Sequence, residues 1–326
     1  MGSVREFMDR HYLHFNSREV VAAARAWEEH LAKGGKMMVT LAGAMSTARI
    51  GRILGRLIRA GKVHAISCTG ANLEEDLFNL LAANEYEIIH DWRALSVEDE
   101  VALYERGFNR VTDTCIPETI MKHLAKRLHR SWSDCCERGT SKTPAEHLFT
   151  VLDDPTLAEH FQIPRDDSWM LAAKEVGIPV FAPGWEDSTT GNMFAARVIK
   201  GELPHHHCVK TGTAQMQALV EWYTANHGAK EGHPSVGFFQ IGGGIAGDFA
   251  ICAVPLMIQD LEWEDTPFWG YFCQISDAAT SYGGYSGAVP NEKITWGKLD
   301  ADTPKFMIQS DASIVAPLIF AYLLGD

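Results

Sequence analysis

The chain has 326 residues, of which 46% are hydrophobic, so it can bury a large core as one or two domains. Its formal charge of −13 argues against a general nucleic-acid binder and suits a protein that handles cations. No apolar run is long enough to span a bilayer, and the N-terminus lacks the apolar segment of a secretory signal. The seven cysteines follow no disulfide-framework spacing, which favours free thiols. We therefore expect a soluble, cytoplasmic protein with no membrane partner.

The first part of the chain alternates between helical and strand patterns. Apolar residues at helical spacing predict a helix over 17–32 with Ser17 as its N-cap, so residues 1–36 are expected to form an N-terminal helical segment. Short apolar runs predict three strands, the first two each followed by a turn and a helix: 37–41, 63–68 and 86–89. This alternation predicts an α/β fold, a Rossmann-like parallel sheet with helices on both faces.

The rest of the chain repeats this alternation after a long polar stretch. Residues 116–173 are predicted to be largely helical, and a further helix is expected over 213–223. Further strands, or units that begin with a strand, are predicted over these segments: 176–193, 235–241, 271–275 and 305–309. No repeat or composition break marks a linker, so residues 37–326 are expected to form a single domain.

A glycine-rich turn follows the strand predicted at 235–241. Gly242-Gly-Gly-Ile-Ala-Gly247 fits the G-x-G-x-x-G pattern, in which glycines let the backbone approach a pyrophosphate at a helix N-terminus. Acidic residues follow at Glu264 and Asp265. In parallel sheets ligands bind beyond the carboxyl ends of the strands, so the turns at 42–47 and 69–75 are candidate ligand loops as well.

A lysine follows a tryptophan and a glycine at the end of a glycine-rich stretch that begins at Tyr282. A solvated lysine is protonated at neutral pH, but an apolar wall such as the Trp296 indole can free the amine of Lys298 for imine chemistry. Gly297 leaves room beside the amine, and Glu292 could bind a cationic substrate or move protons. The alternative is an exposed lysine after a loop tryptophan.

These residues carry a resemblance to a known family. Pro290, Glu292, Trp296-Gly297-Lys298 and the segment 310–318 closely resemble the C-terminal signature of the deoxyhypusine synthase family, and a weaker resemblance runs from about Met38 to the C-terminus. In that family the lysine of the Trp-Gly-Lys motif is the catalytic nucleophile, which implies the same role for Lys298. The resemblance also implies NAD as the cofactor, a polyamine substrate, and a homotetramer with active sites between paired subunits.

The resemblance implies cofactor contacts from several turns. Glu75 falls where the family has a glutamate that contacts the NAD ribose; the alternative for Glu74 and Glu75 is a helix N-terminus stabilised by its dipole. Arg49 could contact the pyrophosphate or face solvent. The full set of cofactor-binding candidates is Ser46, Thr69, Glu75, Asp187, Gly242, Gly243, Gly244, Asp277, Ala278 and Asp311.

The candidate substrate pocket departs from the family pattern. Its candidates are Glu292, Trp296, Asn192, Asp248 and Tyr285. Asn192 and Tyr285 stand where the family has substrate-binding aspartates, and Asp248 stands where it has a substrate-contacting histidine. Gln274 stands where the family has a tyrosine. These departures predict a preference for a different donor or acceptor amine.

The implied reaction is an alkyl transfer by hydride borrowing. NAD oxidises spermidine beside a nitrogen, the lysine captures the aminobutyl group as an imine, and the group passes to an acceptor amine. The acceptor is a protein lysine, as in hypusine formation, or a small amine such as putrescine, as in homospermidine synthesis. A third possibility is a protein that has kept the fold and NAD binding but lost the transfer.

Two cysteine- and histidine-containing segments invite other chemistry. In the run from His205 to Cys208, consecutive residues cannot all face one ion, and the spacing of zinc sites is missing, so we expect a polar loop and no metal. Adjacent residues on a helix point apart, so burial is favoured over redox chemistry for Cys135 and Cys136.

Overall fold

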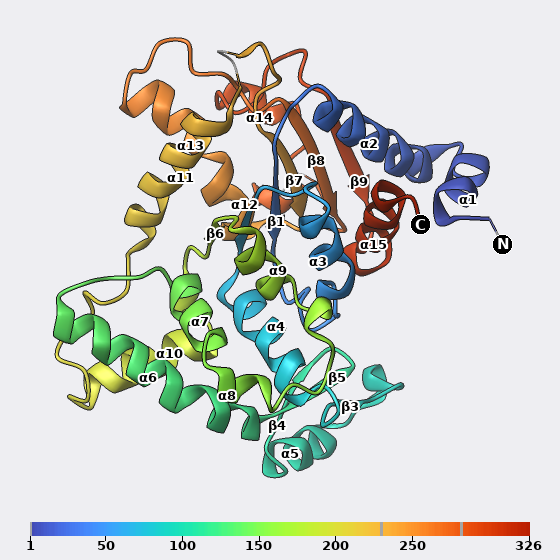
Figure 1. Ribbon diagram of the computed structural model, residues 1–326. Helices are drawn as coiled ribbons and strands as arrows, with labels where there is room; N and C mark the ends of the chain where they lie inside the picture. The colour runs from blue at the N-terminus through green and yellow to red at the C-terminus, as the bar shows by residue number, and fades with distance from the viewer. Residues whose placement is uncertain (1, 229–230, 281–282) are drawn as a thin grey trace.

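A six-stranded parallel sheet forms the centre of the protein in the computed structural model, which describes residues 2–228, 231–280 and 283–326 (Figure 1). All five neighbouring strand pairs are parallel. In spatial order the strands are β6 (Val180–Phe181), β2 (Ala65–Cys68), β1 (Met37–Leu41), β7 (Gly237–Ile241), β8 (Tyr271–Ser276) and β9 (Lys305–Gln309). The predicted Rossmann-like parallel sheet is thereby confirmed.

Helices cover both faces of this sheet because successive side chains of a strand point to opposite faces. Phe239 of β7 packs against Trp27 and Phe320, on the face covered by α2 (Phe15–Ala32), α3 (Gly51–Arg59) and α15 (Ala312–Leu324). Its neighbour Phe238 belongs to a second core cluster on the other face, with α11 (Gly212–Asn226), α12 (Gly244–Ile251) and α13 (Ala253–Pro255).

The N-terminal helix of the prediction begins earlier than expected. A short helix α1 (Val4–His11) precedes α2, and α2 begins at Phe15 with His14 at the N-cap. Ser17 lies within α2, and its hydroxyl donates a hydrogen bond to the His14 carbonyl oxygen at 2.6 Å. Ser17 as N-cap is therefore wrong, because it lies inside the helix.

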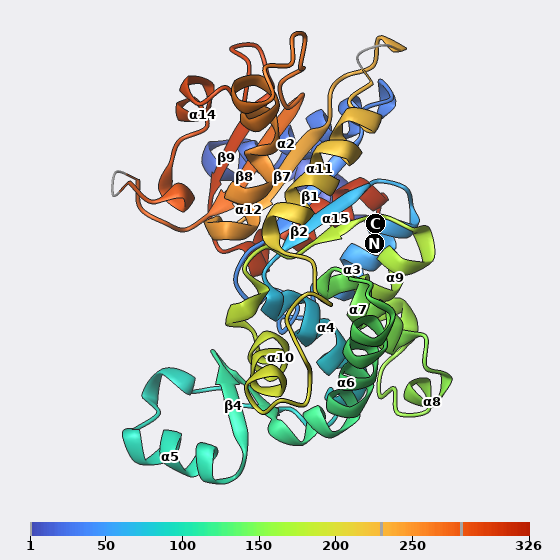
Figure 2. The same ribbon diagram turned by 90° about the vertical axis from the view of Figure 1, so that its left-hand side faces the viewer.

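A small antiparallel sheet lies apart from the main one, at the lower left of Figure 2. It joins β3 (Glu87–Ile88), β5 (Thr114–Pro117) and β4 (Phe108–Val111), with α5 (Val97–Glu105) beside β4. The strand predicted at 86–89 belongs to this sheet and not to the parallel one. Ile88 is 52% exposed, whereas a central parallel strand needs apolar residues buried on both faces.

The middle of the chain is helical, as predicted, except for β5. Three helices of this region contact α4 (Gly70–Ala82), namely α7 (Pro144–Leu152), α9 (Trp169–Val176) and α10 (Thr189–Ile199). The other two are α6 (Met121–Arg138) and α8 (Pro155–Ala158). Two single-turn helices matter below, η4 (Trp185–Asp187) and η7 (Tyr285–Gly287), as does the short α14 (Glu292–Thr295).

The strand order reverses between β1 and β7. From β1 the chain builds outward through β2 to β6, and from β7 it builds in the other direction through β8 to β9. This is the 3-2-1-4-5-6 order of dinucleotide-binding sheets, which hold ligands where the carboxyl ends of the two central strands meet. At this point a Cβ on Gly242 would lie 2.9 Å from the Ala42 side chain, so the two turns touch.

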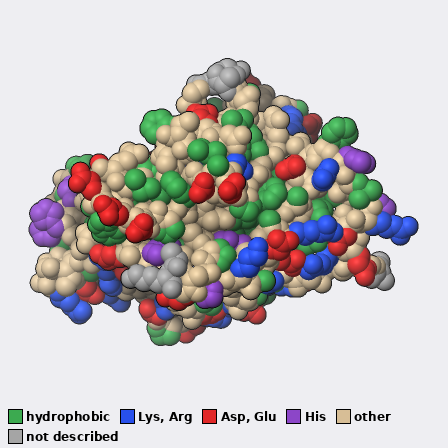
Figure 3. All heavy atoms as spheres, turned by 90° about the horizontal axis from the view of Figure 1, so that it is seen from above, with side chains coloured by type: hydrophobic (Ala, Val, Ile, Leu, Met, Phe, Trp, Pro, Cys, Tyr) green, Lys and Arg blue, Asp and Glu red, His purple; other side chains and the backbone are tan. Residues whose placement is uncertain are grey.

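The face of the molecule seen from above carries both signs of charge (Figure 3). On this face, acidic side chains lie between the basic ones (Figure 3). None of the helices within the described ranges is both long and apolar enough to cross a membrane. All seven cysteines are free thiols, as predicted.

Candidate functional site

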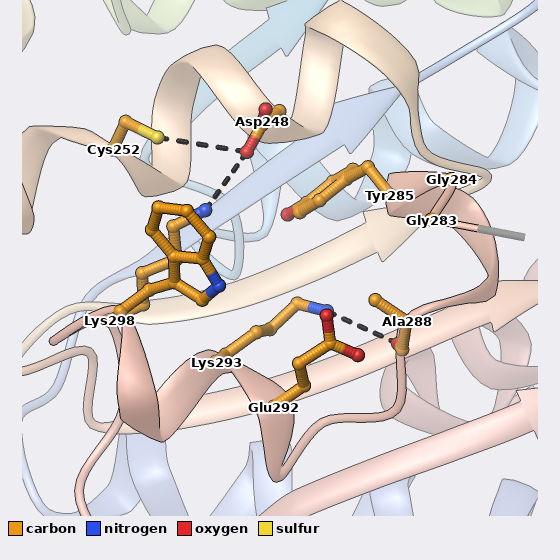
Figure 4. Close-up of a pocket in the computed structure, with 10 residues that line it drawn as sticks. Asp248, Cys252, Gly283, Gly284, Tyr285, Ala288, Glu292, Lys293 and Lys298 are labelled. Carbon is orange, nitrogen blue, oxygen red and sulfur yellow. Dashed lines mark hydrogen bonds and ion pairs between the residues drawn. The ribbon is translucent and has the colours of Figure 1, made fainter. Parts of the chain in front are cut away.

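A cavity of about 250 Å³ lies between α12 and α14, over the face of the sheet formed by β7 and β8 (Figure 4). It is bounded by α12, by the segment around η7 and by α14. Its lining residues are Asp248, Cys252, Gly283, Gly284, Tyr285, Ala288, Glu292, Lys293, Trp296 and Lys298. Five predicted residues, one catalytic and four substrate-binding, meet here, although Asp248 is at least 37 positions from the others in the sequence.

Lys298 reaches into this cavity with its side chain only 8% exposed. Its Nζ lies 3.0 Å from Asp248 Oδ1, and both Asp248 and Cys252 approach it from α12 (Figure 4). The amine lies 5.3 Å from the centre of the Tyr285 ring and 5.7 Å from that of Trp296. The wall is therefore aromatic, as the motif predicted, but a carboxylate is also present.

A second lysine of the same cavity was missed by the sequence analysis. Lys293 is 2% exposed, and its Nζ lies 4.9 Å from the ring centres of both Phe272 and Tyr285. Burial, with a smaller effect of the Lys298 charge, lowers the pKa of Lys293 to about 8. The available signal was weak: a lysine directly after the candidate pocket residue Glu292.

Two buried glutamines fix the wall of the cavity. Gln240 of β7 and Gln274 of β8 are register partners, and both are fully buried. The Tyr285 hydroxyl donates to Gln240 Oε1 at 2.7 Å, and Gln274 Nε2 donates to the Ser286 carbonyl oxygen at 2.6 Å. Gln240 Nε2 also donates to the Gly242 carbonyl oxygen at 2.9 Å, which ties the glycine turn to the same wall.

The glycine turn leaves open space at the start of α12, beside Gly244, and we call this space the cradle. Gly243 is its N-cap and provides no side-chain cap, so the first amides of the helix are available to an anion. A Cβ on Gly244, which has φ +56°, would find no atom within 4 Å, whereas one on Gly243 would lie 2.1 Å from Ser286 Oγ. The turn is thus open on one side and packed against the cavity wall on the other.

The turns after β1 and β2 are bonded to each other. Thr69 caps α4 and donates to the Gly43 carbonyl oxygen at 2.7 Å. Ser46 is fully buried; its hydroxyl bonds to Asn72 and accepts a hydrogen bond from the Trp169 indole at 3.0 Å. The side chains of both candidates therefore hold the shape of the turn.

The adjacent glutamates of α4 have different environments. Glu74 accepts hydrogen bonds from the backbone amides of Thr189 and Thr190 at 2.9 and 2.8 Å, so it caps α10 and not its own helix. Glu75 is buried, accepts a hydrogen bond from the Thr47 hydroxyl, and has no ion-pair partner within the described part of the chain. Burial raises the pKa of Glu75 to about 7. A ribose diol would supply the donors that this carboxylate lacks, so the site fits the nucleotide that the family uses.

The remaining cofactor candidates follow β6, β8 and β9. The loop after β6 touches the start of α12, since a Cβ on Gly184 would lie 2.9 Å from Ile245 Cδ1. Asp187 is exposed at the end of this loop. Asp277 and Ala278 follow β8, and Asp311 caps α15 by accepting from the Ser313 amide at 2.7 Å.

Two residues considered as ligand contacts in the sequence analysis, Asn192 and Arg49, do not line the cavity that contains Lys298. Asn192 is exposed on α10, donates to the Ser188 carbonyl oxygen at 2.9 Å, and does not line the cavity of the same chain. Arg49 pairs with Asp167 at 3.5 Å. In the described ranges no group of three or more His, Cys, Asp or Glu side chains is arranged to hold a metal, and the His205 and His207 rings stack on each other.

The strand order and the glycine turn at its reversal define a Rossmann-like protein with a lysine-containing pocket beside the glycine turn. The chain belongs to the deoxyhypusine synthase family, whose family model matches residues 7–323.

Relatives of known sequence agree with this assignment, and a solved structure agrees with the fold. A deoxyhypusine synthase-like protein of Cyanothece sp. is 27% identical, with 99% of this chain and 80% of the relative covered. A "Probable deoxyhypusine synthase 2" of Methanosarcina mazei is 26% identical, with 97% and 85% covered. The crystal structure of a candidate deoxyhypusine synthase from Entamoeba histolytica has a TM-score of 0.56 at 12% identity, with 98% of this chain and 92% of that one covered, and it supports the fold alone.

Proposed function

We propose that the protein is an NAD-dependent transferase that moves an aminobutyl group from spermidine or a related polyamine to an acceptor amine, with Lys298 as the covalent nucleophile. The observation that carries this proposal is the position of Lys298. Its amine lies in an aromatic-walled cavity whose wall, Tyr285–Ser286, is shared with the glycine turn of the nucleotide cradle. Membership of the deoxyhypusine synthase family supports a transferase of this kind.

NAD is the proposed cofactor. The open side of Gly244 and the uncapped start of α12 would hold the pyrophosphate, and Glu75 would accept hydrogen bonds from a ribose. When bound, NAD would supply the reversible removal of a hydride from the substrate carbon beside nitrogen.

The pocket residues would prepare Lys298 for attack. Asp248 is 3.0 Å from the amine and can accept the proton that Lys298 must lose before it attacks an imine carbon. The Glu292 side chain lines the cavity, forms no ion pair with the residues that the structure describes, and would bind a substrate ammonium. The Trp296 ring is 61% exposed and would cover a bound alkyl chain at the cavity mouth.

The acceptor is proposed to be a protein lysine or a small amine, and the assembly a homotetramer with sites between paired subunits. Exposed apolar residues after β7, β8 and β9 support a subunit contact at this edge of the sheet: Ile245, Val289, Trp296 and Ile314. Pairing would also allow Asn192 of one subunit to act at the pocket of another, which it does not reach in its own chain.

Borohydride trapping tests the nucleophile. With spermidine and NAD, the peptide that contains Lys298 should gain the mass of the aminobutyl group after reduction. Lys298→Ala and Lys298→Arg should lose turnover by at least about a thousandfold, because neither residue can form the imine and a guanidinium stays protonated. Lys122→Ala, which removes an exposed lysine of α6, is the control. Turnover retained by Lys298→Ala would show that the nucleophile is another group.

A further inference from the structure

Only some of the charged side chains that line the cavity form an ion pair with each other. Two lysines and two acids line it, namely Lys293, Lys298, Asp248 and Glu292. Asp248 forms an ion pair with Lys298 at 3.0 Å. Neither Glu292 nor Lys293 has an ion-pair partner within 4.0 Å in the described part of the chain. Glu292 and Lys293, neighbours at the start of α14, therefore remain outside the ion pairs of the described residues.

The unpaired lysine is the unusual one, because Lys293 is buried. Its Nζ is 3.4 Å from two neutral oxygens, Gln274 Oε1 and the Ala288 carbonyl oxygen, which are long contacts for an ammonium group. Two aromatic rings offer further, weaker stabilisation. The Glu292 and Asp248 carboxylates offset part of the cost of burying this cation, but burial has the larger effect. This position therefore fits a further anionic group supplied from the cavity.

A plain polyamine does not supply such a group. Every charge of spermidine or putrescine is positive, so binding would bring an ammonium near the amine of Lys293. The two family aspartates that would offset this charge are absent from the cavity, since Tyr285 is neutral and Asn192 lies outside it.

We propose that this pocket binds a zwitterion: the substrate has a carboxylate that contacts Lys293, an ammonium group that contacts Glu292, and a second amine whose neighbouring carbon would lose a hydride to NAD. The amine of Lys298 would then attack the resulting imine carbon, and the second amine would leave. The class is a diamino carboxylic acid or an N-alkylated relative. This inference deepens the proposed function, since it names the substrate class of the same site. Figure 4 shows how Glu292 and Lys293 leave one short helix beside the cavity.

Matched ligand pairs that differ by one carboxylate test the proposal. We would measure binding by calorimetry, with NAD present, for 1,4-diaminobutane against ornithine and for 1,5-diaminopentane against lysine. The carboxylated member of each pair should bind about tenfold or more tightly, the size of one charge-assisted hydrogen bond. Equal or tighter binding of the plain diamines would overturn the proposal.

Variants of the two unpaired residues sharpen the result. Lys293→Met has a similar shape without charge and should abolish the preference for the carboxylate, while Lys293→Arg should retain part of it. Glu292→Gln should weaken both members of each pair equally. Circular dichroism and thermal unfolding would establish that each variant is folded. A preference that survives in Lys293→Met would show that another group binds the carboxylate.

The same assays separate this inference from the proposed function. Lys298→Ala should lose imine trapping yet keep the carboxylate preference in calorimetry. If spermidine is trapped on Lys298 and the diamines bind best, the transferase stands and the zwitterion proposal fails. If the carboxylated ligands bind best and no amine is trapped, the zwitterion pocket stands and covalent transfer through Lys298 fails.

Discussion

The charge of Lys293 conflicts with its surroundings. Burial lowers its pKa from the ordinary 10.5 to about 8, so protonation is less favourable in the folded state than in the unfolded one. Above pH 10.5 the amine is neutral in both states, and its burial does not reduce the free energy of unfolding through charge. As the pH falls from 10.5 through about 8, the unfolded state gains the proton more readily, and the free energy of unfolding decreases.

We therefore predict that Lys293→Met stabilises the protein at pH 7. The free energy of unfolding should rise by up to about 3 kcal/mol, and the gain should shrink towards zero between pH 8 and 10.5. Urea unfolding at several pH values measures this difference. Lys122→Met, at an exposed lysine, is the matched control and should change little. A destabilised Lys293→Met protein at pH 7 would mean that the ring contacts outweigh the burial of charge.

Glu75 gives a second prediction at the scale of one residue. Burial raises its pKa to about 7, and hydrogen bonds from ribose hydroxyls would favour the ionised form. Because ionisation then accompanies binding, NAD affinity should rise several-fold from pH 6 to pH 8. Glu75→Gln should bind NAD less tightly at pH 8 and lose this pH dependence. Titration calorimetry is the measurement, and a flat wild-type profile would contradict the assigned role of Glu75.

At the scale of elements, the connection from β7 to α12 links the two halves of the site. Its first residues form the glycine turn, and Asp248, one turn later, contacts Lys298. Gly244 has φ +56° with open space where a Cβ would stand, so a side chain there would point into the cradle without meeting the protein.

Gly244→Ala should therefore reduce NAD affinity by tenfold or more, at a cost of roughly 1–2 kcal/mol in stability from the left-handed backbone. Gly61→Ala is the matched control, because Gly61 has φ +68°, equally open space, and a position after α3 away from the cradle. It should lose similar stability and retain NAD binding. An equal loss of NAD affinity in both variants would show that strain, and not occupation of the cradle, is the cause.

At the scale of the whole molecule, four of the exposed apolar residues, Ile245, Val289, Trp296 and Ile314, lie in segments that follow β7, β8 and β9. Ile314 is 63% exposed at the start of α15, near the end of β9. Val176 is 48% exposed but precedes β6, at the opposite edge. If two chains pair through the surface beside the site, Ile314 would be buried in the contact and Val176 would remain exposed.

We expect light scattering after size-exclusion chromatography to give the mass of four chains. Ile314→Glu should lower that mass and reduce turnover, because a buried charge without a partner disfavours the interface. Val176→Glu should leave both unchanged. A monomeric wild-type protein with full activity would contradict the assignment of the sites to subunit interfaces.

The sequence alone determined the strands of the main sheet and the position of the nucleophile candidate. The strands at 37–41 and 305–309 were predicted at their observed bounds, because each contains a short apolar run that leaves a local signal, although only the first is buried along its whole length. The glycine turn was also predicted from the sequence, because a positive φ and a close approach of the backbone both require glycine at Gly242. Lys298 was found through a short motif.

Only the tertiary structure decided what surrounds that lysine. The ion pair with Asp248 spans 50 positions, and the contacts of Lys293 with Phe272 and Gln274 depend on the register of β8. The strand at 87–88 has strand-like residues, but its place in a separate antiparallel sheet depends on pairing with β5. Local patterns of polarity specify which face of an element is buried, whereas the partners and their charges are set by packing between distant segments.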